Sequence, residues 1–335
     1  MTFKEVLLLK QYWTFIKVLE LDNIKVLELD NIKIEKNILN VALVNRYYIM
    51  DIRAELETKG YCVIPNVLKK EECLQAYNMF HEWKNSIPNH DKIHYNVDPH
   101  GIYKYLEVGH TRHAWFIRTR ESVQNIFKEL WGCDELVVSF DGSCYIPKEF
   151  KKKDKCWLHS DQAPITEGLQ CIQGFVSVTE NSERTFVAYE GSHKMHHQYF
   201  KDKGIQNSKN WNKIAEEDVE NMKELRRVLH VPAGSLVIWD SRTFHQNQYG
   251  APNSEERLVQ YVCFLPKNHP KNTKNMKAKR LKYYNDRRTT SHWPCPIRVN
   301  SLQPQTYGDN SRLIDYSSLT PPNLEEFESE IIKLL

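Results

Sequence analysis

The sequence has no CxxC pair among its eight cysteines, no long apolar run and no excess of charge of one sign. Scattered cysteines argue against a zinc knuckle or a disulfide scaffold and favour a reducing, intracellular (cytoplasmic) compartment. No segment approaches the length of a membrane span, and the start, MTFKEVLLLKQYW, lacks the apolar core and cleavage site of a signal peptide. The 46 Lys and Arg nearly match the 43 Asp and Glu, so composition makes nucleic acid an unlikely partner.

What is present indicates a folded chain, because 41% hydrophobic and 27% charged residues are ordinary for a globular protein. Residues 16–31 contain IKVLELDN twice in tandem, and an imperfect third copy begins at Ile32. Perfect identity over so short a unit is typical of a recent slippage duplication, whereas a solenoid needs longer units. Residues 1–45 are therefore expected to be an accessory extension.

Residues 46–270 are expected to form the main domain. Helical patterns at 51–60, 69–85 and 121–132 predict a helical support over 51–132. Many short strand-like segments with turn signals follow in 133–266, interrupted by a turn-rich insert at 201–221.

This pattern predicts a mostly β fold with helical support, a double-stranded β-helix of the jelly-roll, cupin-like kind. The remaining residues, 271–335, contain a basic run and a terminal helical pattern at 324–335. They are expected to be a basic C-terminal extension whose charges are solvated.

One short motif carries metal chemistry. His159 and Asp161 lie in the strand-like segment KCWLHSDQ, and the side-chain period of two places them on the same face. Both can then reach one ion. The motif is weak alone, since chance gives roughly two His-x-acid matches in a chain of this composition.

Later residues make the pattern more specific. His245 follows an apolar strand 84 positions after Asp161, and Arg257 opens another strand 12 positions after His245. Two imidazoles and one carboxylate form the facial triad that suits Fe(II), because they leave one side of the ion open. Zinc with the same ligands is the alternative, but such enzymes usually carry HExxH, which is absent from the sequence.

Taken together, these segments resemble the phytanoyl-CoA dioxygenase family of Fe(II)- and 2-oxoglutarate-dependent oxygenases. The resemblance covers roughly residues 51 to 266 and lies in GYCVIPNVLKKEEC, WLHSDQ, YEGSHK, PAGSLVIWDSRTFHQN and APNSEERLVQYVCF. It implies that His159, Asp161 and His245 hold iron and that Arg257 binds the distal carboxylate of 2-oxoglutarate. It further implies that O2 is consumed and a small-molecule substrate is hydroxylated.

Other positions have two interpretations each. Tyr145 and Gln173 are candidate cofactor-binding residues, with structural roles as the alternative; Gln162 could touch substrate or support a ligand. His193, in a Gly-Ser-His turn, is expected to stabilise a loop and not to bind metal. Lys151–Lys153 could attract an anionic substrate or belong to a solvated loop.

Two functions of different classes remain open at this stage. The first is an oxygenase acting on a small molecule such as an acyl thioester, a lipid-like compound or a specialised metabolite. The second is a catalytically silent member of the fold, acting as a binding or accessory module. Substrate choice is expected to depend on loop 88–120, whose ring-bearing side chains predict a decorated cavity: His94, Tyr95, His100, Tyr103, Tyr105, His110, His113 and Trp115.

Overall fold

The structure is a computed structural model that describes residues 51–90, 100–151 and 154–335. Asp51–Leu335 form one compact unit. The segment 271–335, expected to be an extension, therefore belongs to the same unit as the oxygenase-like core. The proposed accessory extension, 1–45, lies outside the described residues.

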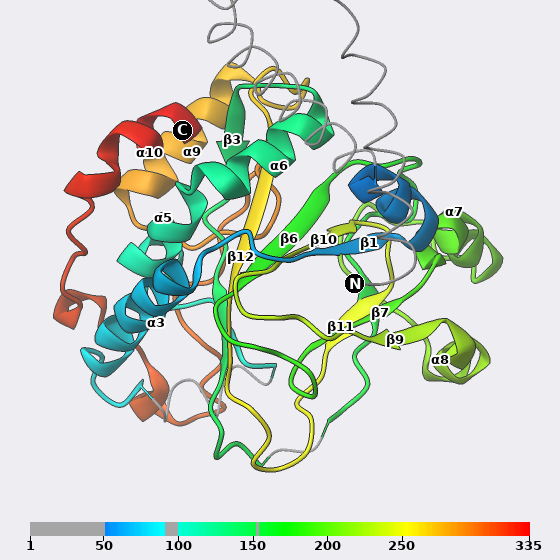
Figure 1. The fold of residues 1–335 in the computed structure, drawn as a ribbon, viewed down its shortest axis with the longest axis horizontal. Coiled ribbons are helices and arrows are strands. Elements are labelled where there is room, and N and C mark those ends of the chain that lie inside the picture. The colour runs from blue at the N-terminus through cyan, green and yellow to red at the C-terminus, as the bar shows by residue number, and fades with distance from the viewer. Residues whose placement is uncertain (1–50, 91–99, 152–153) are drawn as a thin grey trace, which may run out of the picture. The chain divides into compact units, whose positions relative to one another are not determined.

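Helices surround the sheets (Figure 1). After a helical stretch at 51–59, the main α-helices are α3 (Lys70–Asn85), α5 (Arg112–Arg118), α6 (Glu121–Trp131), α7 (Ser192–Asp202), α8 (Glu216–Asn221), α9 (Lys274–Asn285) and α10 (Glu328–Leu334). Helix α6 ends where the sequence predicts it, because Gly132 has a left-handed φ of 62° that glycine adopts without strain. The predicted terminal helix is confirmed by α10.

The strands form two antiparallel sheets. The seven-stranded sheet has the order β1-β10-β6-β12-β4-β2, with β3 also paired to β12. Its strands are β1 (Tyr61–Ile64), β2 (Ile102–Tyr103), β3 (Leu136–Val138), β4 (Ser143–Ile146), β6 (Ile172–Ser177), β10 (Leu236–Asp240) and β12 (Arg257–Pro266). The five-stranded sheet has the order β8-β5-β11-β7-β9, made of β5 (His159–Ser160), β7 (Phe186–Tyr189), β8 (Asn212–Lys213), β9 (Arg226–Val228) and β11 (His245–Asn247).

The two sheets pack together through buried aromatic side chains. Phe186 of the smaller sheet lies 5.7 Å from Phe175 and 4.7 Å from Trp239 of the larger sheet, between ring centroids. Burying aromatic rings on both inner faces excludes water from the space between the sheets. The functional site lies at one end of this core.

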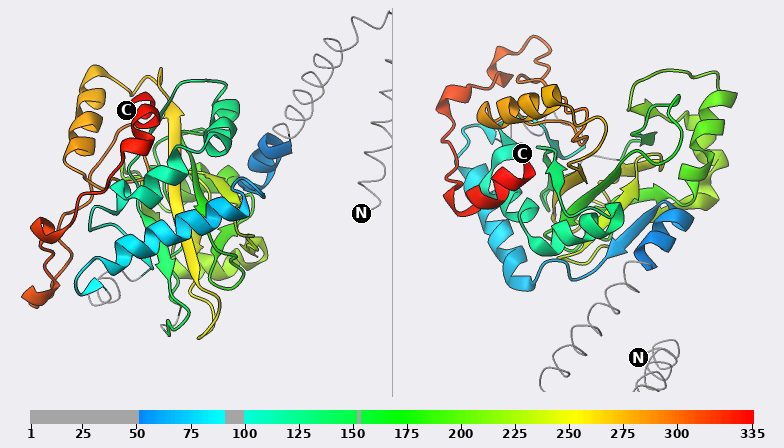
Figure 2. Two further views of the ribbon diagram at one scale, coloured as in Figure 1. Left: turned by 60° about the vertical axis from the view of Figure 1, so that its left-hand side comes forward. Right: turned by 90° about the horizontal axis from the view of Figure 1, so that it is seen from above.

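The expectation of a mostly β chain is not supported, because the fold mixes helices with antiparallel sheets. Helices α3, α5 and α6 cover one side of the larger sheet, and α9 and α10 complete this layer (Figures 1 and 2). This layer forms part of the core, because α5 and α6 bury the side chains of Trp115, Phe116 and Phe127. Helix α5 lies inside the region expected to be a substrate loop.

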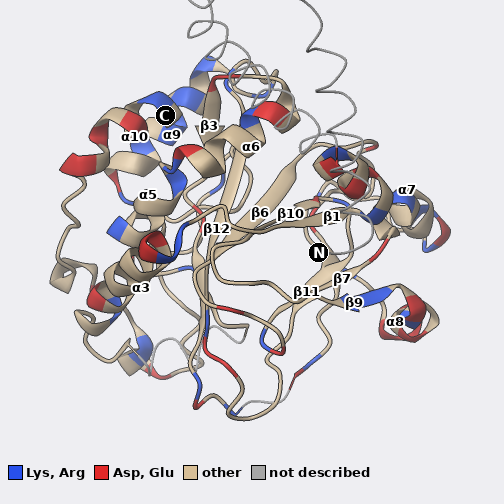
Figure 3. Cartoon of the chain, in the orientation of Figure 1, with Lys and Arg blue, Asp and Glu red and all other residues tan. Residues whose placement is uncertain are grey.

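Charged side chains lie mainly outside the sheets. Figure 3 shows that Lys, Arg, Asp and Glu gather on the helices and loops, while strands β6, β10 and β12 carry few of them. In the described part of the chain, no helix combines the length and apolar character needed to cross a bilayer.

Candidate metal centre

The centre is built on a pair of neighbouring strands. His159 of β5 and His245 of β11 are direct antiparallel partners, so their side chains point to the same face. Asp161 follows β5, and its backbone N–H donates to the Ser241 carbonyl at 3.1 Å. One ligand atom from each of these three buried residues can be chosen so that all lie within 4.8 Å of one another, close enough to hold one metal ion.

Backbone carbonyls fix the orientation of both imidazoles. His159 Nδ1 donates to the Trp157 carbonyl at 3.0 Å, and His245 Nδ1 donates to the Thr243 carbonyl at 2.9 Å. Because a carbonyl accepts only from a protonated nitrogen, both Nε2 atoms keep a free lone pair. His159 Nε2 lies 3.7 Å from the Asp161 carboxylate, and His245 Nε2 lies 3.2 Å from it.

The protonation states suit a metal. Burial, and then the neighbouring His245, lower the pKa of His159, which favours the neutral imidazole that a metal needs. Burial alone would raise the pKa of the Asp161 carboxyl, but His292, His159 and His245 outweigh it and hold this pKa well below its usual range. The lowered pKa of His159 and the lowered pKa of Asp161 both favour the forms that bind a metal ion.

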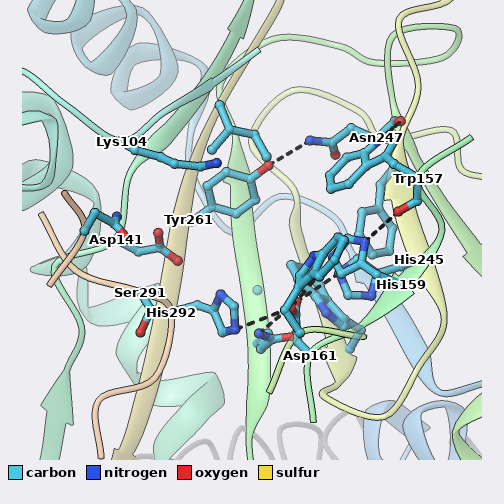
Figure 4. Close-up of a pocket in the computed structure, with 17 residues that line it drawn as sticks. Lys104, Asp141, Trp157, His159, Asp161, His245, Asn247, Tyr261, Ser291 and His292 are labelled. Carbon is cyan, nitrogen blue, oxygen red and sulfur yellow. Dashed lines mark hydrogen bonds and ion pairs between the residues drawn. The ribbon is translucent and has the colours of Figure 1, made fainter. Parts of the chain in front are cut away.

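The donor set fits a divalent ion that needs open positions. Asp161 Oδ1 is buried and has no hydrogen-bond partner among the described residues, as expected for an oxygen reserved for an ion. Two imidazoles and one carboxylate occupy one side of such an ion. The other side faces a cavity of about 220 Å³ (Figure 4).

Gln173 reaches this centre from β6. Its side chain is buried, lines the cavity, and donates from Nε2 to Asp161 Oδ2 at 3.3 Å. The contact is thus with a ligand of the metal centre. This geometry gives Gln173 a positioning role for the Asp161 carboxylate.

Arg257 is fully buried at the start of β12. Its Nε, Nη1 and Nη2 atoms make no hydrogen bond with any described residue. The guanidinium lies over the Phe175 ring, 5.4 Å from its centroid, and its charge lowers the pKa of Tyr261 against the larger effect of burial. It does not line the cavity directly, whereas Tyr261 does.

Tyr145 is not brought to the triad. Tyr145 follows Cys144 on β4, and consecutive residues of a strand point to opposite faces of the sheet. The two side chains therefore lie on opposite faces. Its ring packs against Phe80 and His81 of α3, with centroids 5.2 Å and 5.4 Å away. The structural alternative for Tyr145, aromatic packing, is the one that the geometry matches.

Gln162 turns away from the cavity. It donates to the carbonyls of Thr166 and Gly168 and accepts from Ser241 Oγ at 2.8 Å, so it holds its own loop. His193, expected to stabilise a loop, uses Nε2 to donate to the Glu57 carbonyl at 3.1 Å.

The expectation that the rings of loop 88–120 decorate the cavity is wrong for the six that the structure describes, because none of them lines it. His110, His113 and Trp115 are buried in the helical layer, where His113 Nδ1 donates to the Ala76 carbonyl at 2.8 Å. Of the lysines 151–153 only Lys151 is described; it is exposed and does not line the cavity. His94 and Tyr95 lie outside the described residues.

Several cavity residues were missed by sequence analysis. They come from segments without a recognisable motif: Lys104, Asp141, Trp211, Ser291, His292 and Asn300. Three of these belong to the C-terminal segment that was expected to be a solvated extension. Its place beside the triad depends on tertiary packing, for which the local sequence carries no periodic signal.

A family model describes the same region independently. Residues 56–249, more than half of the chain, match the model of Phytanoyl-CoA dioxygenase (PhyH). The chain belongs to the phytanoyl-CoA dioxygenase family. A relative from Aspergillus versicolor, "Ava biosynthesis cluster protein O", is 29% identical over 240 residues, covering 65% of this chain and 78% of that protein.

Two solved structures are also similar to this chain. HygX from Streptomyces hygroscopicus, with nickel and 2-oxoglutarate bound, has a TM-score of 0.47 and 13% identity over 65% of this chain and 87% of its own. The epimerase SnoN, in complex with Fe3+, alpha ketoglutarate and nogalamycin RO, has a TM-score of 0.46 and 16% identity over 66% of this chain and 84% of its own.

Proposed function

We propose that this family member is an Fe(II)- and 2-oxoglutarate-dependent oxygenase that hydroxylates a small molecule. The observation that carries the proposal is the buried guanidinium of Arg257, which lacks a partner in the described chain. Burying an unpaired charge is costly, so a protein keeps one only where a ligand of opposite charge completes it. A carboxylate matches a guanidinium bidentately.

Iron is the metal that the donor set favours. His159, Asp161 and His245 offer two nitrogens and one oxygen on one side of the ion, which is the arrangement used by non-haem Fe(II) oxygenases. The histidines come from two strands, and not from one helical HExxH motif as in the common zinc enzymes with this ligand set.

Arg257 and the triad belong to one interior. Phe175, under the guanidinium, lies 6.0 Å from Trp239, and Trp239 lies 5.3 Å from His245. We place the distal carboxylate of 2-oxoglutarate at Arg257 and its keto acid at the triad. Tyr261, held by the Asn247 amide at 2.9 Å, lines the cavity beside the triad.

When bound, iron and 2-oxoglutarate supply the oxidising chemistry, in which O2 is consumed and the co-substrate leaves as succinate and CO2. The residues of the chain bind these groups and exclude water from the site. Phe186 stacks at 5.2 Å from His245 and Trp157 at 4.7 Å from His159, so aromatic rings shield both ligands. We also propose that the two sheets together form a double-stranded β-helix.

The catalytically silent alternative would be expected to lose the carboxylate or the arginine. Both are present and buried here. The charges of the basic C-terminal segment are not all solvated, since Arg280 in α9 is fully buried. No feature of the described residues favours the silent module over the oxygenase.

The direct test is 2-oxoglutarate turnover without any added substrate. The wild-type protein should form succinate slowly in the presence of Fe(II) and O2, and Asp161→Ala should form none above background. Asp134→Asn, an exposed carboxylate away from the cavity, should behave as wild type. Equal succinate formation by wild type and Asp161→Ala would refute the proposal.

A further inference from the structure

Beside the triad, the cavity has a second carboxylate that the proposed chemistry does not use. Asp141 lines the cavity, and Figure 4 shows its carboxylate directed into it. Oδ1 accepts from the Gly142 N–H at 2.7 Å. No Lys, Arg or His among the described residues forms an ion pair with this carboxylate.

His292 and Arg118 lower the pKa of the Asp141 carboxyl against the larger effect of burial, but neither side chain forms an ion pair with this carboxylate among the described residues. The Arg118 guanidinium donates to the backbone carbonyls of Gly109 and Asp141, and not to the Asp141 carboxylate. His292 directs Nε2 at Asp161 Oδ1, 3.7 Å away. Lys104 also lines the cavity, but it is exposed and lies beyond ion-pair distance of Asp141. The Asp141 carboxylate is therefore positioned to accept a hydrogen bond from a ligand in the cavity.

The other wall is aromatic. Trp157 stacks between His100, at 3.9 Å, and His159, at 4.7 Å, and its indole N–H donates to the Asn247 carbonyl. Trp211 lies 5.4 Å from the His159 ring and is 51% exposed. An indole so exposed at the edge of a cavity offers a face for a ligand.

The insert 201–221 holds Trp211 in place. Strand β8, which begins at the next residue, pairs with β5, so that Lys213 lies opposite His159 and Asn212 opposite Ser160. The insert is thus hydrogen-bonded to the strand that carries the metal ligand. The insert therefore places Trp211 next to the metal ligand His159.

We propose that the substrate is a small molecule carrying a protonated amine beside a flat apolar or aromatic ring. The ammonium pairs with Asp141, and the ring packs against the exposed face of Trp211. Burial raises the pKa of the Asp141 carboxyl, so a cationic ligand also offsets the cost of keeping it ionised.

This inference rests on the proposed function only for the chemistry at the triad, because binding at Asp141 and Trp211 needs no metal. The probes are 2-phenylethylamine, 2-phenylethanol and phenylacetate, which present a cationic, a neutral and an anionic group beside one ring. Their affinities are measured by tryptophan fluorescence and calorimetry on the full chain, metal-free and again with Fe(II) and 2-oxoglutarate under nitrogen.

The amine should bind wild type at least about tenfold more tightly than the alcohol or the acid, as expected for a charge-assisted contact. Asp141→Asn should remove that preference, while the exposed control Asp134→Asn keeps it. Trp211→Ala should weaken amine and alcohol alike, by about threefold to tenfold. Leu281→Ala, an equally exposed apolar residue on α9, is the matched control and should change neither.

Equal affinities for amine and alcohol in wild type, or tighter binding of phenylacetate than of the amine, would overturn the proposal. This comparison needs no variant, so a misfolded Asp141→Asn protein does not block the test. Calorimetry with 2-oxoglutarate on the same samples separates the two claims. If 2-oxoglutarate binds but the amine is not preferred, only this inference is wrong. If the amine is preferred but 2-oxoglutarate does not bind, only the proposed function is wrong.

Discussion

His159 and His245 face each other across the β5–β11 pair, with ring centroids 4.3 Å apart. Backbone pairing sets this relationship, and each ring is then oriented by a carbonyl of its own strand segment. A site held by a β-ladder keeps its geometry when one side chain is removed. Loss of a ligand should therefore act on the metal more than on the fold.

Replacing His159 or Asp161 with Ala should abolish iron binding while leaving the fold intact. Each change removes one of three ligands of the ion but only a small part of the core. Anaerobic equilibrium dialysis with Fe(II), combined with circular dichroism, measures both effects. His230→Ala, whose imidazole is largely exposed, is the control and should bind iron as wild type. Unchanged affinity in His159→Ala would remove that residue from the centre.

Gln173→Leu should weaken iron binding by about 10- to 100-fold, because the amide that orients Asp161 is lost. Competition against a coloured Fe(II) chelator gives the affinity. Gln170→Leu is the matched control, since Gln170 donates only to the Glu167 carbonyl in the preceding loop. If both variants bind iron equally well, Gln173 is only a packing residue.

Buried histidines in the helical layer should make stability depend on pH. Burial is the largest cause that lowers the pKa of His113, to about 4, against about 6.5 in an unfolded chain. The folded pKa is depressed, so this stability is fully present above about pH 6.5 and is lost as the pH falls toward 4. His110, lowered to about 3 by burial first and Arg118 next, acts in the same direction.

The variant His113→Gln isolates this effect, because glutamine can still donate to the Ala76 carbonyl but does not titrate. Between pH 6.5 and 4 the free energy of unfolding of wild type should fall more steeply, by about 1.4 kcal/mol per pH unit. Urea unfolding at several pH values measures the two slopes. Parallel slopes would mean that His113 is protonated equally in the folded and unfolded states.

Arg280 should be essential for docking the C-terminal segment. Its guanidinium donates to Asn272 Oδ1, to the carbonyls of Leu335 and Pro294, and to Cys295 Sγ. Arg280→Ala leaves several buried acceptors unpaired and should cost about 2 to 4 kcal/mol in urea unfolding. Lys282→Ala, exposed on the same helix, should cost less than about 0.5 kcal/mol. Similar losses in both would contradict the docking role.

The sequence was informative wherever function depends on residue type at short or ordered spacing. Strand periodicity predicts one face for His159 and Asp161, and order along the chain predicts the return of His245 on another strand. The strand β5 ends at Ser160, so Asp161 reaches the site from the bend that follows it. The triad of His159, Asp161 and His245 is the group that the structure brings together.

The sequence was least informative where side chains meet only through tertiary packing. His110 and His113 look like cavity residues in a polar, aromatic segment, yet a 3-10 turn (Val108–His110) and the short helix α5 place them in the core. Conversely, His292 lies in a segment without periodicity and reaches Asp161 only because α9 and the terminal residues fold back on the sheet. Tyr145 faces α3 because β4 alternates, and its register could not be known beforehand.

The central claim, that the triad and Arg257 together bind iron and 2-oxoglutarate, is tested most directly by anaerobic titration of 2-oxoglutarate into the Fe(II)-loaded protein. A visible charge-transfer band should appear in wild type. In Arg257→Lys, which keeps the charge but loses the bidentate fork, the same band should need about 10- to 150-fold more 2-oxoglutarate, while iron binding hardly changes. No band in iron-loaded wild type, or equal affinities in both proteins, would contradict the account.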